Sequence, residues 1–169
     1  MLAALTAATP GIWGDDPYMC PGSPAFVHAS ARVRALADVP CDVVRAEMLA
    51  RVEGQFESWH DPHNNGTYTA KWRAPRNLAF ERLTGNEKYI DKVMIQLTDS
   101  GSGECEMMSC SESQVTSILD FGTNYCNSRM LYCGKKDGCR PVLHDFETTE
   151  QTVKLSSGAK ADLKLCLTI

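Results

Sequence analysis

The clearest helical pattern of the chain lies at residues 41–57. Val44, Met48, Val52 and Phe56 follow one another every fourth residue, and charged side chains occupy the other side of the same turns. Pro40, directly before this run, is a helix start signal. The pattern therefore predicts an amphipathic helix over 41–57 that buries one face.

From residue 67 the spacing of hydrophobic positions changes from helical to alternating. Tyr68, Ala70 and Trp72 alternate with polar residues, and further alternating runs are separated by turn sequences at 84–86 and 99–103. Residues 67–110 are therefore predicted to form a four-stranded antiparallel meander with one face against the helix at 41–57.

A second, shorter helix is predicted after the meander. Ser111 and Gln114 have the spacing of a capping box ahead of a small apolar run, which favours a helix over about 112–120. Residues 122–141 are rich in turn residues and hold three cysteines, so we expect a loop region ordered by disulfides. The predicted fold class is α+β, an antiparallel β-meander packed on an N-terminal amphipathic helix.

The amino-terminal part shows weaker periodicity. Residues 23–36 are rich in Ala, Ser and Arg and contain no acid, which is typical of an organelle targeting sequence, whereas a surface arm or short helix is the plainer interpretation. We therefore expect an irregular arm over 1–37, a targeting remnant or an element that docks on a partner. A single disulfide-bonded domain is expected over 38–169.

The cysteines carry the strongest compositional signal. Their number is even, none is part of a C-x-x-C pair, and five of them lie between 105 and 139, which favours disulfides formed in an oxidising compartment over zinc or redox motifs. The secretory route, or an organelle lumen such as that of a plastid, is the expected location. The eight are Cys20, Cys41, Cys105, Cys110, Cys126, Cys133, Cys139 and Cys166.

Eight cysteines permit about 105 pairings, and sequence does not choose among them. One hypothesis is that Cys41 pairs with Cys166 and closes the domain, with the remaining pairs local in sequence.

Charge and hydropathy exclude some classes of binding partner. The formal net charge is −4, and no dense run of basic residues occurs. The chain therefore has no extended positive field to bind phosphates, and we do not expect nucleic acid as a partner. No apolar stretch is long enough for a transmembrane helix, which leaves peripheral association with a membrane complex open. No cofactor is expected.

His60 and His63, with Asp61 between them, are the candidate metal ligands. Two imidazoles and a carboxylate suit zinc or copper, but Pro62 prevents the helical geometry that lets two histidines share one ion. The alternative is that this loop only turns the chain toward the first strand of the meander.

Asn65-Gly66-Thr67 is an acceptor sequence for N-glycosylation, placed on a predicted surface loop. A glycan at Asn65 would accord with passage through the secretory pathway.

A partner-binding surface is predicted in the disulfide-rich region. Apolar residues held on a covalently fixed loop are typical of recognition sites, and their alternative role is a small core around the disulfides. The residues concerned are Tyr125, Met130, Leu131 and Tyr132.

Three functions remain open. The first is a non-catalytic recognition module or accessory subunit of a larger assembly in an extracytoplasmic compartment, for example a peripheral subunit of a photosynthetic membrane complex. The second is a carrier of a small ligand or carbohydrate, with a pocket lined by Trp59, Trp72 and Tyr89. The third is a secreted metal-dependent hydrolase that uses His60 and His63. Because no elbow, P-loop or paired acids at a cleft are evident, we expect no catalytic residue.

Overall fold

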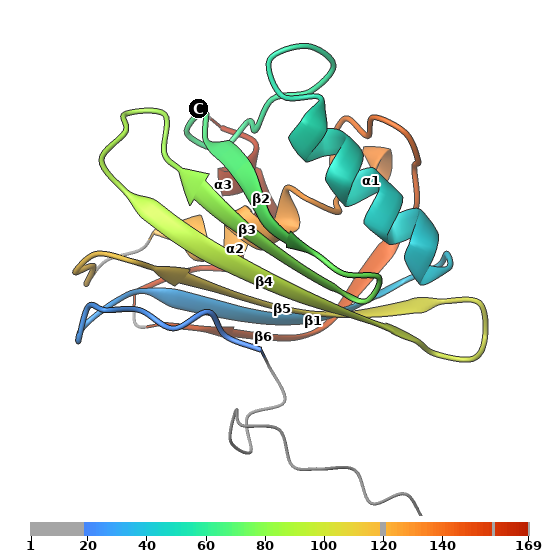
Figure 1. Cartoon of the computed structure of the whole chain (residues 1–169), viewed down its shortest axis with the longest axis horizontal. Coiled ribbons are helices and arrows are strands. Elements are labelled where there is room, and N and C mark those ends of the chain that lie inside the picture. The colour runs from blue at the N-terminus through green and yellow to red at the C-terminus, as the bar shows by residue number, and fades with distance from the viewer. Residues whose placement is uncertain (1–18, 119–120, 157, 169) are drawn as a thin grey trace, which may run out of the picture.

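The computed structural model describes residues 19–118, 121–156 and 158–168, and within them the chain forms one antiparallel sheet with helices on one side (Figure 1). The sheet has six strands in the order β2-β3-β4-β5-β1-β6. The protein is therefore a mixed α+β protein. In chain order the strands are β1 (Ser30–Ala37), β2 (Thr67–Arg73), β3 (Asn77–Leu83), β4 (Ile90–Asp99), β5 (Cys105–Ser113) and β6 (Thr148–Leu155).

The helices are α1 (Cys41–Glu53), α2 (Thr123–Arg129) and α3 (Leu163–Cys166), with a 3-10 turn at Lys135–Asp137. Helix α1 lies within the range 41–57 and ends at Glu53, where Gly54 follows. It packs on β2, β4 and β5, whereas α2 packs on β5 and β1. The sheet curves around these helices, so its core face is concave in Figure 1.

Alternation along the strands places one set of side chains between sheet and helices. In the centre of the sheet this set is apolar, with Leu78, Phe80, Val93 and Ile95 all buried. Val44, Met48 and Val52 of α1 belong to the same buried cluster. These side chains fill the interface between helix and sheet and form a close-packed hydrophobic core.

The expected irregular arm over 1–37 is wrong for its last residues. Ser30–Ala37 form β1, which pairs with β5 on one side and with β6 on the other. The alternating positions Ala31, Val33, Ala35 and Ala37 are buried on the core face, which is why the segment folds as a strand. Residues 19–29 of the predicted arm form neither helix nor strand, and residues 1–18 lie outside the described residues.

The predicted helix over 112–120 is also wrong for the residues that the structure describes there. Strand β5 continues to Ser113 because Ser111 and Ser113 pair across the sheet with Val93 and Asp91 of β4. Bends and a turn follow, and the second helix, α2, begins only at Thr123.

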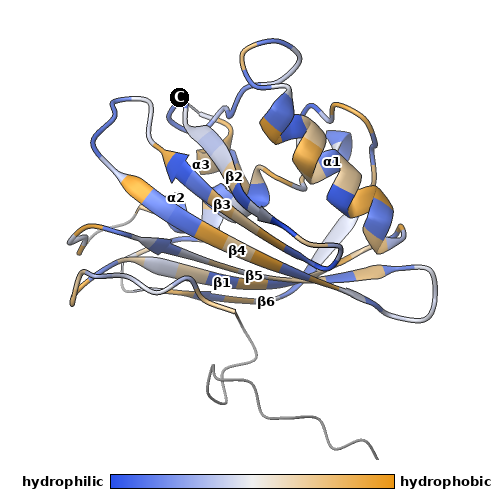
Figure 2. Ribbon diagram, viewed as in Figure 1, coloured by the Kyte–Doolittle hydropathy of each residue, from blue (hydrophilic) through white to orange (hydrophobic). Residues whose placement is uncertain are grey.

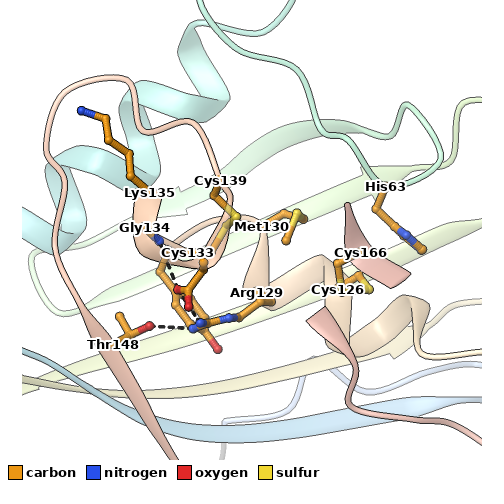
Figure 3. Close-up of a disulfide and its surroundings, with 12 residues drawn as sticks. His63, Cys126, Arg129, Met130, Cys133, Gly134, Lys135, Cys139, Thr148 and Cys166 are labelled. Atoms are coloured by element: carbon orange, nitrogen blue, oxygen red, sulfur yellow. Dashed lines mark hydrogen bonds and ion pairs between the residues drawn. A yellow bond between two sulfur atoms is a disulfide. The ribbon is translucent and has the colours of Figure 1, made fainter. Parts of the chain in front are cut away.

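Four disulfides cross-link the fold, and every cysteine takes part. The hypothesis of a Cys41–Cys166 clasp is wrong: Cys41 at the start of α1 lies beside Cys105 at the start of β5, while Cys166 of α3 lies beside Cys126 of α2. Figure 3 shows the α2–α3 bond close to the short loop closed by Cys133 and Cys139. The fourth bond, Cys20–Cys110, spans 90 residues, so only one of the four is local.

Four disulfides indicate an oxidising, extracellular-type environment for the folded protein. Within the described part of the chain, every helix is too short or too polar to cross a bilayer.

Candidate functional site

The core face of the sheet changes from apolar to polar toward one end. Continuing the alternation of Leu78 and Phe80 brings Arg82 onto the buried face, and Asp91 of β4 lies directly opposite it. Ser113 of β5 is the next cross-strand neighbour of Asp91. Buried polar groups must be paired to be tolerated, so this end of the sheet requires partners from outside the sheet.

Arg82 finds its partners in the loop that precedes β2. Its Nε lies 2.7 Å from Oδ2 of Asp61, and its Nη2 donates to the backbone carbonyl of His63. Burial raises the pKa of Asp61, while the Arg82 guanidinium and the His63 N–H oppose that rise. This ion pair fixes the loop at 60–66 onto the sheet.

Asp91 is bound from the other side by helix α2. Nδ2 of Asn127 donates to Oδ2 of Asp91 at 2.8 Å and lies 3.1 Å from Oγ of Ser111. Ser111 in turn donates to Oδ1 of Asn124, whose Nδ2 donates to Oγ of Ser113. A continuous buried hydrogen-bond network therefore ties α2 to the polar end of the sheet.

A groove of about 650 Å³ opens at this end. Asp91 and Ser113 belong to its wall together with residues from three loops, and this volume is in the usual range for small-molecule sites. The lining residues are Asn64, Asn65, Thr84, Gly85, Asn86, Tyr89, Asp91, Ser113, Thr116, Ser117, Ile118, Phe121 and Thr123.

Exposed apolar side chains surround the groove. Of the eleven large apolar residues that are exposed in the described part of the chain, seven lie at this end of the sheet. Backbone hydrogen bonds hold the segments together, since Ser117 N–H donates to Val27 and Gln114 N–H donates to Ile90. Figure 2 shows hydrophobic colour at the start of β4 and on neighbouring loops. We call Phe26, Val27, Ile90, Val115 and Ile118 the apolar rim; Ile118 also lines the groove, as do Tyr89 and Phe121.

The predicted metal ligands lie in different surroundings. His60 is exposed, whereas His63 is buried with Nδ1 3.2 Å from the carbonyl of Leu165 and Nε2 3.4 Å from Oγ1 of Thr123. Burial and, to a smaller extent, the nearby Arg82 charge lower the pKa of His63 to about 4. Among the described residues, no group of three ligand atoms close enough for one ion includes His60, Asp61 or His63. The geometry does not support a shared metal here.

The predicted partner-binding residues of the disulfide-rich region are buried. Tyr125, Met130, Leu131 and Tyr132 are each at most 3% exposed and belong to the main core cluster. The prediction that they form a recognition surface is wrong, because packing against α1 and the sheet leaves their side chains no access to a partner.

Asn65 is exposed and lines the groove, so its side chain is accessible for glycan attachment. It follows Asn64, whose carbonyl accepts a hydrogen bond from Gly85 N–H. The acceptor sequence therefore lies against the β3–β4 turn.

The aromatic residues proposed as one pocket lie in different places. Tyr89 is in the groove, Trp59 contributes to a second hollow of about 440 Å³ beside the Cys133–Cys139 loop, and Trp72 lines neither of these two hollows. Phe80 and Tyr68 are core residues.

The sequence indicated Asn65 and Tyr89 for other roles, but it did not predict the groove, because most of the lining residues carry no pattern that points to a site. Asn64, Asn86, Thr116 and Thr123 stand in turns or polar stretches, and only the fold brings them together. The one available signal was the break in hydrophobicity along the alternating strands, where Arg82 and Asp91 occupy positions that the pattern assigns to the core.

Fold and site together define a disulfide-bonded α+β protein with an open polar groove inside an apolar rim. In comparison with known proteins the chain matches no family model, no curated protein and no solved structure.

Proposed function

We propose that the protein is a non-catalytic recognition module, or an accessory subunit of a larger assembly, in a secreted or organelle-lumenal setting. Its partner is a protein that covers the apolar rim at the polar end of the sheet. A peripheral subunit of a membrane complex, in a plastid lumen for example, is a special case of this proposal.

The observation that carries the proposal is the concentration of exposed apolar side chains in one place. Phe26 is fully exposed and Ile118 is 72% exposed, and both belong to the same rim. Single exposed apolar residues are ordinary on protein surfaces, whereas a contiguous group is typical of an interaction site. Desolvation of such a group on binding is favourable at roughly 25 cal/mol per Å².

The alternative functions find less support. A carrier with an internal cavity requires space between sheet and helices, but that interface is filled by the core. A hydrolase centred on His60 and His63 requires the two rings to converge, and Asp61 between them is already paired with Arg82. Of the described residues that line the groove, Asp91 is the one acid, so two carboxylates are not assembled there for glycoside hydrolysis.

Photocrosslinking in the oxidised full chain tests the proposal. A photoreactive amino acid is placed at position 26 or 118 in the rim and, as a control, at position 143, because Leu143 is 59% exposed and lies outside the rim. The cells that make the protein are irradiated, and both the soluble and the membrane fractions are examined. We expect both rim positions to crosslink the same partner.

Crosslinking of that partner at position 143 with equal yield, or adducts at 26 and 118 with unrelated proteins, would contradict the proposal. A partner found in the membrane fraction would favour the peripheral-subunit case, and one found in the soluble fraction would favour a secreted module.

A further inference from the structure

The groove differs from the rim in its chemistry. Amide and hydroxyl side chains dominate its lining, and the described lining residues include no Lys, Arg or His. Among these described lining residues Asp91 supplies the one negative charge; it is 1% exposed and held by Asn127. A phosphate, a sulfate or a carboxylate in this groove would lack a cation and lie near a carboxylate, so electrostatics disfavours anionic ligands.

Several polar side chains in the groove retain hydrogen-bonding capacity. Nδ2 of Asn86 has no hydrogen-bond partner among the described residues, although its Oδ1 accepts from Thr84 Oγ1 and Lys88 N–H. The Asn65 amide and the hydroxyl groups of Tyr89, Thr116 and Ser117 line the same groove, and no hydrogen bond joins them to another described residue. The groove therefore offers both donors and acceptors, as a ligand with many hydroxyl groups requires.

Two aromatic rings stand at the groove. Tyr89 is 47% exposed and Phe121 is 72% exposed, so each presents a large part of its ring to solvent. Tyr89 is fixed by the β3–β4 turn, where Thr84 N–H donates to its carbonyl and its own N–H donates to Thr84 Oγ1. An exposed ring on a fixed stretch of backbone, beside free amides, suits the apolar face of a pyranose, while the amides bind its hydroxyl groups.

The geometry points to a binding site for a neutral saccharide in this groove, between the β3–β4 turn and the segment that follows β5. This inference goes beyond the proposed protein contact, because it uses Asn86 and Tyr89 rather than the rim.

The saccharide has two possible sources, a glycan on the chain itself or an external sugar. Asn65, the acceptor of the glycosylation sequence, is itself part of the groove wall. A glycan on Asn65 would start at the site, and its first sugars would lie within reach of Tyr89, since Gly85 of the same turn approaches Asn65 closely. The other source is a saccharide free in solution or carried by a partner.

The first experiment uses the full chain with its disulfides formed but without glycosylation, as made in a bacterial periplasm. Amide resonances are followed during titration with N,N′-diacetylchitobiose, cellobiose and mannobiose, and with glucose 6-phosphate as an anionic control. We expect at least one neutral sugar to shift resonances of the groove. Tyr89→Ala and Asn86→Ala should each weaken its binding at least tenfold.

Trp72→Ala is the matched control, because Trp72 is 46% exposed but lies outside the groove. It should leave the affinity unchanged. The inference is overturned if none of the three neutral sugars shifts groove resonances, if Trp72→Ala weakens binding as much as Tyr89→Ala, or if glucose 6-phosphate binds more tightly than every neutral sugar.

The second arm separates the two sources in chain secreted from eukaryotic cells with Asn65 glycosylated. If its own glycan occupies the groove, this form does not bind added sugar, and Thr67→Val, which removes the acceptor sequence, restores binding. If the ligand is external, the glycosylated chain binds added sugar as the unglycosylated chain does. Both results support the site. Intact sugar binding without a rim crosslink contradicts only the proposed protein contact, and the converse result contradicts only the saccharide site.

Discussion

Glu47 and Arg51 lie one turn apart on α1 and form an ion pair that is withdrawn from solvent, with Nε of Arg51 2.7 Å from Oε1 of Glu47. The Glu47 carboxylate also accepts the N–H groups of residues 142, 143 and 144. Arg51 donates to the carbonyls of Met130 and Cys133. The pair therefore joins α1 to the chain on both sides of the Cys133–Cys139 loop.

Replacement of Glu47 by Ala should cost about 3–5 kcal/mol of the free energy of unfolding, because it leaves the Arg51 charge buried without its partner. Glu53→Ala on the same helix is the control: Glu53 pairs with Arg73 at the surface, and the expected cost is at most about 1 kcal/mol. Urea unfolding of the oxidised proteins gives both values. Should Glu47→Ala prevent folding, Glu47→Gln provides the milder variant, and equal costs at 47 and 53 would refute the assigned role.

His63 should make stability depend on pH. Its pKa is lowered to about 4 by burial and by Arg82, so between about pH 6.5 and pH 4 the unfolded chain binds a proton that the folded chain does not. The stability that His63 contributes is complete above pH 6.5 and is lost as the pH falls toward 4, by roughly 3 kcal/mol in all. Across this window the free energy of unfolding should change less steeply with pH in His63→Asn than in the unchanged protein. An identical slope in the two proteins would disprove the assignment.

The disulfides should differ in their contribution to stability. Cys126–Cys166 closes a loop of 40 residues, whereas Cys133–Cys139 closes one of 6. In the chain-entropy model, loss of the first bond costs about 4 kcal/mol and loss of the second about 2 kcal/mol. Calorimetry of the two double Cys→Ala variants tests the order. A lower melting temperature for the variant without Cys133 and Cys139 would show that local packing outweighs loop closure.

Gly66→Ala should destabilise the loop that carries Asn65. A Cβ at position 66 would overlap the guanidinium of Arg82, which is fully buried and paired with Asp61. Overpacking of this kind costs typically about 1–3 kcal/mol. The substitution keeps the glycosylation sequence, so occupancy of Asn65 can be measured in the same variant. Gly101→Ala is the control, because a Cβ at position 101 meets no neighbouring atom and strains only an exposed turn. A larger loss of the free energy of unfolding in Gly101→Ala than in Gly66→Ala would contradict the explanation.

Local patterns predicted the elements in which one face is strongly apolar. The strands β2 to β5 form the meander expected over 67–110, although β5 continues to Ser113, because Phe80, Val93 and Ile95 alternate with polar residues. Strand β1 was missed since its buried positions are mainly alanines, which have low strand propensity and resemble a targeting segment in composition. Strand β6 was missed because it is a polar edge strand paired only with β1.

The disulfide pairing and the groove depend on contacts between distant segments. Cys41 meets Cys105 because α1 crosses the sheet near the start of β5, and no local signal in either segment specifies that crossing. The spacing of Glu47 and Arg51 predicts an ion pair between them. It does not predict that the pair is buried, because the segment around residue 143 that covers it is remote in sequence. The contact between Asn65 and the β3–β4 turn was not predicted for the same reason, because the two segments are separated in sequence.

The nesting of the disulfides has a consequence for proteolysis. The Cys41–Cys105 bond lies inside the segment closed by Cys20–Cys110, and both enclose the exposed turn at 100–103 between β4 and β5. A protease that cleaves this turn therefore separates no fragment, because two covalent links still join the pieces. Such a nicked molecule would migrate intact until a reductant is added, and its groove and rim would stay assembled after damage that releases fragments from an unbridged protein.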